Sequence, residues 1–190
     1  MTLAREMALE SEYVMGTFAR KPVEFVEGHG MTLIDDAGNE YLDFLSGIGV
    51  CSLGHCHPSI VQAVSDQAAK LIHVSNYYYI EHRGEVAQLL SNMLNAYVDE
   101  PSPETWKTFF ANSGAEANEC AIKLARLYAR RRTEAAGKDA ELAPRLIVTL
   151  AKSFHGRTLA TLAATAQPAK QEAFQPLPAG FTATPINDVE

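Results

Sequence analysis

The chain has 190 residues, of which 47% are hydrophobic, so it can bury the core of one domain, or of a domain with a small appendage. Its 16 basic and 23 acidic residues leave a net charge of −7, which argues against nucleic acid as the main partner. No stretch has the length of a membrane span, and the acidic N-terminus lacks the apolar segment of a signal peptide. The three cysteines, without regular spacing, fit reduced thiols, so we expect a cytoplasmic protein with no membrane partner.

Residues 23–44, VEFVEGHGMTLIDDAGNEYLDF, alternate apolar and polar side chains around two glycine-containing turns. This pattern is typical of short antiparallel strands joined by tight turns. The following stretch, LSGIGVCSLGHCHP at residues 45–58, is rich in glycine and fits neither a helix nor a strand. We therefore expect residues 1–57 to form a helix and β-hairpin segment, separate from the rest of the chain.

From Pro58 onward, helical patterns alternate with apolar strands. Apolar spacing predicts helices at about residues 58–72 and 81–97, and DEPSPE at residues 99–104 is typical of a linker. Strands are predicted at residues 105–111, 145–151 and 181–186, and helices begin near residues 113 and 156. The apolar run RLIVTLA at 145–151 suits a strand buried on both faces of a parallel sheet. This order predicts an α/β domain with a mostly parallel sheet over residues 58–190.

A turn of small residues joins the strand at 105–111 to the following helix. Ser113 and Glu116 have the spacing of a capping box, and taken alone they indicate only a well-formed helix start. The turn follows a strand directly, however, and Gly114 and Ala115 leave the backbone N–H groups accessible. Such groups at a helix N-terminus bind phosphate, and the Ser113 hydroxyl can add a further hydrogen bond. The pattern matches neither of the common glycine-rich nucleotide motifs.

The segment NSGAEANECAIKLAR, which contains this turn, resembles the phosphate-binding segment of class III aminotransferases, which depend on pyridoxal 5′-phosphate (PLP). Four more stretches agree with that family in the same order, namely YLDFLSGIGVCSLGHCHP, KLIHVSNYYYIE, SFHGRTLATLAATAQ and PAGFTATPIND. The resemblance covers almost the whole chain. It is strongest to acetylornithine and succinylornithine aminotransferases, and it implies an aspartate aminotransferase-like fold whose small domain begins with residues 1–57 and whose large PLP-binding domain begins at residue 58.

The resemblance also implies roles for individual residues. Gly114 and Ala115 would bind the cofactor phosphate with their N–H groups, together with Ser113, and Phe154 would stack on the pyridine ring. Arg157 is similar to the family arginine that binds the substrate α-carboxylate, for which a planar guanidinium is well shaped. Read alone, the same two side chains in FHGR would be a core phenylalanine and a surface arginine.

Three further residues are weaker candidates for the substrate pocket. Tyr78 and Tyr79 lie in a tyrosine cluster that is usually core or interface packing, but that in the related enzymes approaches the active site. Ile48 stands where ornithine aminotransferases have a tyrosine, and an apolar residue there fits an acylated substrate better than a free ammonium group.

Two other clusters indicate structure rather than function. His55, Cys56 and His57 in GHCHP invite a metal site, but adjacent ligands rarely meet the geometry of zinc, so we predict none. Arg126 and the arginines at 130–132 fall near the end of the long helix, where cations complement the helix dipole, so a solvated face is expected.

The resemblance further implies that the Schiff-base lysine of transamination lies beyond this chain. None of the seven lysines matches the lysine-bearing motif of the family: Lys21, Lys70, Lys107, Lys123, Lys138, Lys152 and Lys170. We therefore expect the first part of an aminotransferase of arginine biosynthesis, inactive by itself, in a homodimer or in complex with a C-terminal half. An α/β module that binds a phosphorylated ligand or a protein partner without chemistry is the alternative. Ornithine, succinylornithine and 4-aminobutyrate are alternative amino donors to acetylornithine, with 2-oxoglutarate as acceptor.

Overall fold

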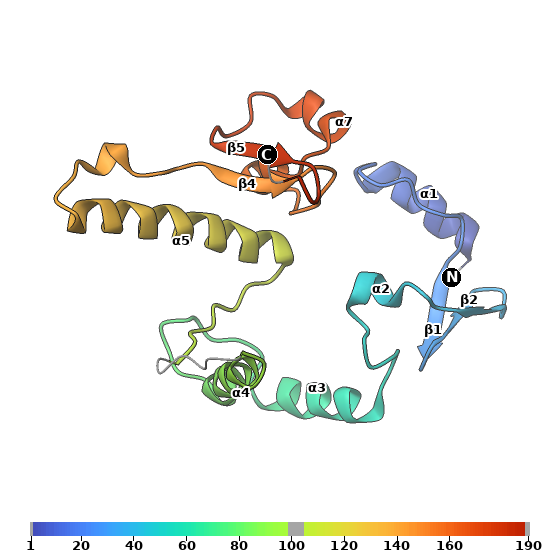
Figure 1. Ribbon diagram of the computed structural model, residues 1–190. Coiled ribbons are helices and arrows are strands. Elements are labelled where there is room, and N and C mark those ends of the chain that lie inside the picture. Colours follow the sequence, from blue (N-terminus) through green and yellow to red (C-terminus); the bar gives the residue numbers. More distant parts are fainter. Residues whose placement is uncertain (1, 99–104, 189–190) are drawn as a thin grey trace. The chain divides into compact units, whose positions relative to one another are not determined.

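The computed structural model describes residues 2–98 and 105–188. The chain divides into two compact units, Met1–Ile80 and Glu81–Glu190. The predicted α/β class is confirmed, because the first unit holds a small antiparallel sheet and the second holds a parallel strand pair with helices (Figure 1). The predicted linker at 99–104 lies outside the described residues. Among the described residues, no helix combines the length and apolar character needed to cross a lipid bilayer.

The first unit has the strands and the helix from Pro58 that the sequence predicts, whereas the stretch expected to be irregular contains one short, distorted helix at Ser46–Gly49. Its elements are α1 (Leu3–Tyr13), β1 (Phe25–His29), β2 (Thr32–Asp35), β3 (Glu40–Leu42), α2 (Ser46–Gly49) and α3 (Pro58–Lys70). The three strands pair antiparallel in chain order, as the alternating pattern predicts. Pro58 begins α3, where its missing N–H costs nothing. Because the units divide after Ile80, α3 belongs to the first, whereas the domain boundary expected between residues 57 and 58 stays a prediction.

Asp35 organises the turn between β2 and β3. Its carboxylate accepts hydrogen bonds from the N–H groups of Ala37 (3.0 Å) and Asn39 (2.8 Å), from the Asn39 amide (2.9 Å) and from the Tyr41 hydroxyl (2.9 Å). The Asn39 side-chain amide is the main cause that holds the pKa of the Asp35 carboxyl below its usual value. A buried carboxylate with this many donors stabilises the turn in its ionised form.

A contact between Asp43 and His55 joins the two ends of the irregular segment that follows β3. The Nε2 atom of His55 lies 2.7 Å from one carboxylate oxygen of Asp43, and the other oxygen accepts from the N–H groups of Leu45 and Ser46. The bond to His55, followed by the two backbone bonds, lowers the pKa of Asp43. His55, which the sequence placed in a candidate metal cluster, therefore has a structural role inside the first unit.

The second unit is built around a strand–helix–strand connection. Its elements are α4 (Arg83–Ala96), α5 (Gly114–Ala135), η1 (Ala140–Leu142), β4 (Ile147–Leu150), α6 (Leu159–Ala164), α7 (Pro168–Gln171), η2 (Glu172–Phe174) and β5 (Phe181–Thr184). The strands β4 and β5 run parallel, with Ile147 opposite Phe181, and α6 lies on the connection between them. This arrangement is the crossover that the predicted order of strands and helices implies.

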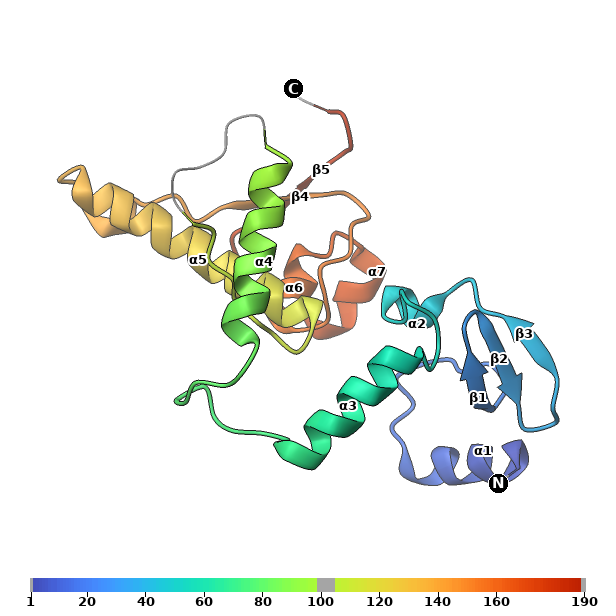
Figure 2. The same cartoon turned by 90° about the horizontal axis from the view of Figure 1, so that it is seen from below.

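The core of this unit gathers at α6, which contacts α5, α7, β4 and β5 (Figure 2). Leu162 is 4% exposed, and Thr161 and Thr165 are fully buried. Both threonine hydroxyls are satisfied locally, since Thr165 donates to the Thr161 carbonyl (2.9 Å) and Thr161 donates to the Thr158 carbonyl (3.2 Å). A six-residue helix with these threonines is therefore held by burial rather than by helix propensity.

Two strand predictions differ from the structure. Residues 105–111 form no strand, because among the described residues no other strand lies alongside to bond with them, and the Trp106 N–H instead donates to the Ser91 hydroxyl (3.1 Å). The strand expected to be buried on both faces leaves Val148 60% and Leu150 47% exposed. A central strand needs neighbours on both sides, and within the described residues β4 has only β5.

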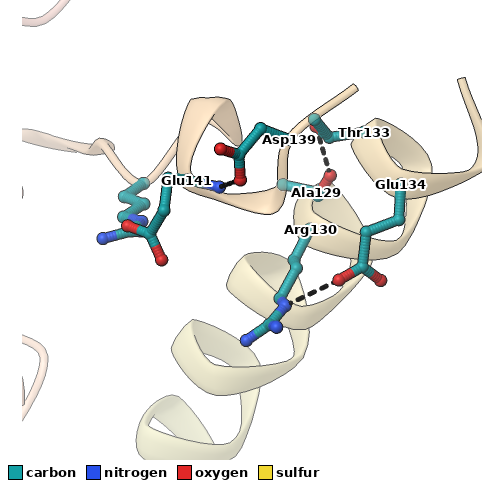
Figure 3. Close-up of polar contacts among 7 residues, drawn as sticks. Ala129, Arg130, Thr133, Glu134, Asp139 and Glu141 are labelled. Atoms are coloured by element: carbon teal, nitrogen blue, oxygen red, sulfur yellow. Dashed lines mark hydrogen bonds and ion pairs between the residues drawn. The ribbon is translucent and has the colours of Figure 1, made fainter. Parts of the chain in front are cut away.

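The C-terminal end of α5 is stabilised by short-range polar contacts (Figure 3). Arg130 donates to the Glu134 carboxylate at 3.0 Å, which raises the pKa of Arg130, and the Thr133 hydroxyl donates to the Ala129 carbonyl at 2.9 Å. The exposed pair of Arg130 and Glu134 fits the solvated face predicted for the basic cluster.

Arg126 departs from that prediction. Its guanidinium lies 5.3 Å from the Phe181 ring centroid and donates to the Ala179 carbonyl (3.2 Å), so it ties α5 to the start of β5.

Candidate functional site

The N-terminus of α5 has the cap that the sequence predicts, with one difference. The Ser113 side-chain oxygen accepts a hydrogen bond from the Glu116 N–H at 3.2 Å. The Glu116 carboxylate, however, accepts from the N–H of Asn112 at 2.7 Å rather than from Ser113. The helix start is thus fixed by both side chains, and the reciprocal bond of the capping box is displaced by one residue.

This cap leaves three donors available to an anion. Among residues 2–98 and 105–188, the structure gives the N–H groups of Gly114 and Ala115 no acceptor, as expected for a first helical turn. The Ser113 hydroxyl uses its oxygen to accept from Glu116 and can still donate its proton. An added Cβ at Gly114 would meet no atom within 4 Å, so a ligand can approach the backbone there. The donors, the open space and the helix dipole fit a phosphate group.

The loop after β4 presents one aromatic ring outward. Phe154 is 60% exposed, which excludes the core phenylalanine that FHGR alone suggested. On either side of it, the Ser153 hydroxyl oxygen and the His155 Nε2 atom are buried and have no hydrogen-bond partner within the described part of the chain. The Arg157 guanidinium lies 5.2 Å from the Phe154 ring centroid, a cation–π contact that occupies one face of the ring. The structure therefore brings together the predicted stacking ring and the predicted carboxylate-binding arginine.

The same loop lies against the first two turns of α5. Gly156 has a φ of +136°, and a Cβ added there would lie 2.7 Å from the Ala115 Cβ and 2.6 Å from the Thr161 hydroxyl oxygen. The Asn118 amide donates to the His155 carbonyl at 2.8 Å, and the Thr158 hydroxyl donates to the Glu119 carboxylate. These contacts place Ser113, Gly114 and Ala115 in one region with Phe154 and Arg157.

Ile48, Tyr78 and Tyr79 belong to the first unit, and their roles in the substrate pocket remain predictions. All three side chains are exposed, at 84%, 66% and 103% respectively. Ile48 also adopts a left-handed backbone with φ of 62°, which is unusual for a β-branched residue.

Sequence reasoning gave no role to the residues that join the loop to α5. Asn118 follows Ala115 by three positions, so the two share one face of the helix, and this spacing could have indicated that Asn118 faces the same neighbour. The close approach at Gly156 had no signal beyond the glycine itself, because glycine also occurs in ordinary turns.

The sequence model of the family described as "Aminotransferase class-III" matches residues 17–190. The chain belongs to this family. The membership confirms the resemblance read from the motifs, together with pyridoxal 5′-phosphate as the family's cofactor.

Individual relatives agree. An acetylornithine aminotransferase from Nitrosomonas europaea is 47% identical over 178 residues, which are 94% of this chain and 41% of the relative. The ornithine aminotransferase of Toxoplasma gondii has a similar structure, with a TM-score of 0.83 and 26% identity over 99% of this chain and 41% of that one. A taurine:2-oxoglutarate aminotransferase from Bifidobacterium kashiwanohense, solved with PLP and glutamate, gives a TM-score of 0.72 and 27% identity over 97% of this chain and 38% of that one. The chain thus spans about two fifths of the length of the relatives it matches.

Proposed function

We propose that this chain supplies part of the active site of an aminotransferase that moves an amino group from N2-acetylornithine to 2-oxoglutarate with PLP, in arginine biosynthesis. One observation carries the proposal: the loop with Phe154 and Arg157 lies against the N-terminus of α5, through Gly156 on Ala115 and through the bond from Asn118 to the His155 carbonyl. A phosphate site, an aromatic face and a guanidinium are thereby held together in the second unit.

Each group has a defined task in this proposal. The N–H groups of Gly114 and Ala115 and the Ser113 hydroxyl bind the phosphate, assisted by the helix dipole. Phe154 covers one face of the cofactor ring with its free face, since Arg157 occupies the other. Arg157 binds a carboxylate of the amino acid or 2-oxo acid through paired hydrogen bonds. When bound, PLP supplies the electron sink that lets a bond at the amino-bearing carbon break.

The choice of amino donor rests on two arguments. Relatives similar in sequence include proteins named acetylornithine aminotransferase. Ile48 is apolar, and if it lines the pocket of the complete protein it favours an acylated amine over a buried free ammonium group. Tyr78 and Tyr79 would line the same pocket.

We extend the proposal to the assembly and location. The described residues expose many large apolar side chains, among them Phe44 at 94% and Ile72 at 87%, which favours burial in a homodimer or against further protein segments. The three cysteines are unpaired in the structure, which is compatible with a reducing cytoplasm.

The experiment is a donor panel on the protein at its natural length. With 2-oxoglutarate as acceptor, acetylornithine, succinylornithine, ornithine and 4-aminobutyrate are compared by kcat/KM. We expect acetylornithine to be preferred. A preference for ornithine or 4-aminobutyrate would overturn the donor, and PLP binding without turnover of any donor would favour a non-catalytic module.

A second experiment addresses the 190 residues alone. The purified chain of verified mass is incubated with PLP, reduced with borohydride and mapped by peptide mass spectrometry. We expect no stoichiometric labelling of any of its seven lysines and no transamination. Site-specific labelling of one lysine together with turnover would show that the chain carries its own covalent cofactor site.

A further inference from the structure

Asn118 joins two segments of the second unit that are far apart in the sequence. It lies in the second turn of α5, and its side-chain amide donates to the His155 carbonyl, 37 residues further along the chain, at 2.8 Å. Asn118 is half-buried, and the acceptor belongs to the peptide between His155 and Gly156. The bond therefore joins the helix with the predicted phosphate site to the loop with the predicted ring and carboxylate contacts.

His155 is held at both ends of its backbone. Its N–H donates to the hydroxyl of the fully buried Thr165 at 2.9 Å, which attaches it to the end of α6. Its carbonyl accepts from Asn118, which attaches it to α5. Phe154 precedes His155 and Arg157 follows it by two residues, so these two bonds set the direction in which both side chains leave the loop.

The loop is packed so closely against α5 at Gly156 that it cannot shift further toward the helix. Gly156 has no room for even one added carbon, because the added atom would approach both Ala115 and Thr161 to less than 3 Å. Packing thus sets how closely the loop approaches the helix, and a directional hydrogen bond is needed to set its position along the helix. Asn118 provides that bond.

We propose that Asn118 is a positioning residue, which fixes the Phe154 ring and the Arg157 guanidinium relative to the phosphate-binding N-terminus of α5. The inference rests on the proposed function, because PLP must bind its phosphate at α5 and its ring at Phe154 simultaneously. Loss of the Asn118 donor leaves the His155 carbonyl without this partner. The bond from the Thr158 hydroxyl to the Glu119 carboxylate then still joins the end of the loop to α5, but the part of the loop between Phe154 and Arg157 can shift along the helix. The distance between Phe154 and the N-terminus of α5 then no longer matches the distance between the ring and the phosphate of PLP, which is a rigid molecule.

The test uses the protein at its natural length and two substitutions of similar size. Asn118→Leu removes the amide, and Asn118→Asp keeps the shape but replaces the donor with an acceptor, so it carries the test if the leucine variant does not fold. Asn95→Leu is the matched control, because it removes from α4 the side-chain oxygen that accepts a hydrogen bond from the Trp106 indole N–H (2.8 Å), in the same unit and without touching the loop. Folding at 10 °C is verified by far-UV circular dichroism, and the melting temperature of each apoprotein is measured.

The deciding measurements are the PLP dissociation constant and the visible circular dichroism of bound PLP, which reports the orientation of its ring. We expect both Asn118 variants to raise the dissociation constant on the order of tenfold, the effect of one lost hydrogen bond, and to change the visible signal. Asn95→Leu should lower the melting temperature but leave the PLP dissociation constant and the visible circular dichroism unchanged. If the Asn118 variants lower the melting temperature but keep native affinity and signal, Asn118 is structural only and the inference is wrong. If the unmodified protein binds no PLP, the proposed function itself fails.

Discussion

Replacing Gly156 with alanine tests whether the loop with Phe154 and Arg157 lies against α5 as the structure shows. The added Cβ would lie 2.7 Å from the Ala115 Cβ and 2.6 Å from the Thr161 hydroxyl oxygen. Favourable contacts between carbon atoms need about 3.5–4.0 Å, so the loop or the helix has to move by about 1 Å. Thr161 is fully buried and cannot move aside easily.

The magnitude has two parts. Overpacking of this kind costs about 1–3 kcal/mol. The φ of +136° is a conformation for glycine, and an alanine there adds about 1–3 kcal/mol of strain. We expect Gly156→Ala to lower the free energy of unfolding by about 2–6 kcal/mol and to weaken PLP binding because the loop is displaced.

Substitutions at two other glycines of the same unit distinguish the cost of overpacking from the cost of backbone strain. Gly137 has a φ of +71° but no atom within 4 Å of an added Cβ, so Gly137→Ala measures backbone strain alone, about 1–2 kcal/mol. Gly84 lies inside α4 with open space and an ordinary φ, so Gly84→Ala should be neutral or stabilise by about 0.5–1 kcal/mol. The assay is urea unfolding at natural chain length, followed by far-UV circular dichroism. A cost for Gly156→Ala no greater than that for Gly137→Ala would refute the close packing of loop and helix.

The other predictions concern the remaining parts of the site and the first unit. Arg157→Lys cannot form the paired hydrogen bonds of a guanidinium to a carboxylate, so kcat/KM for both substrates should fall by an amount that corresponds to about 2 kcal/mol of transition-state stabilisation. Unchanged kcat/KM values would show that Arg157 does not bind the substrate. Gly114→Asp sets a carboxylate against the phosphate and should weaken PLP binding by several kcal/mol (~3 or more) in an otherwise folded protein, whereas native affinity in a titration would leave only the capping role. Asp35→Asn should unfold more easily than the native protein at pH 7. Because hydrogen bonding lowers the pKa of Asp35, the native carboxylate loses its contribution as the pH falls below about 4, so the difference between the two proteins should shrink there, and a constant difference in urea unfolding would contradict this. Sedimentation should show a homo-oligomer for the protein at natural length, and a monodisperse monomer would exclude the homodimer.

Local patterns were enough to predict most elements of the chain. The alternation at residues 23–44 predicted the antiparallel strands, and Ser113 predicted the start of α5, because strand pleating and helix capping depend on residues close in sequence. The same reasoning predicted a strand at residues 105–111. A strand, however, is made by hydrogen bonds to a partner that can lie anywhere in the chain, so apolar alternation alone could not establish it.

The sequence by itself determined the family, and it predicted a phosphate-binding turn at residues 113–115 and roles for Phe154 and Arg157, since all of these depend on residue types in a fixed local order. Only the tertiary structure decided that the turn and the loop are neighbours, because no local rule predicts that Gly156 meets Ala115 or that Asn118 bonds to His155 across 37 positions. The tertiary structure also decided between the two alternatives that the sequence left for Phe154, because it leaves the ring exposed instead of in the core. Burial and close approach arise from packing among distant segments, and that packing joins the predicted phosphate-binding turn and the loop with Phe154 into one candidate site.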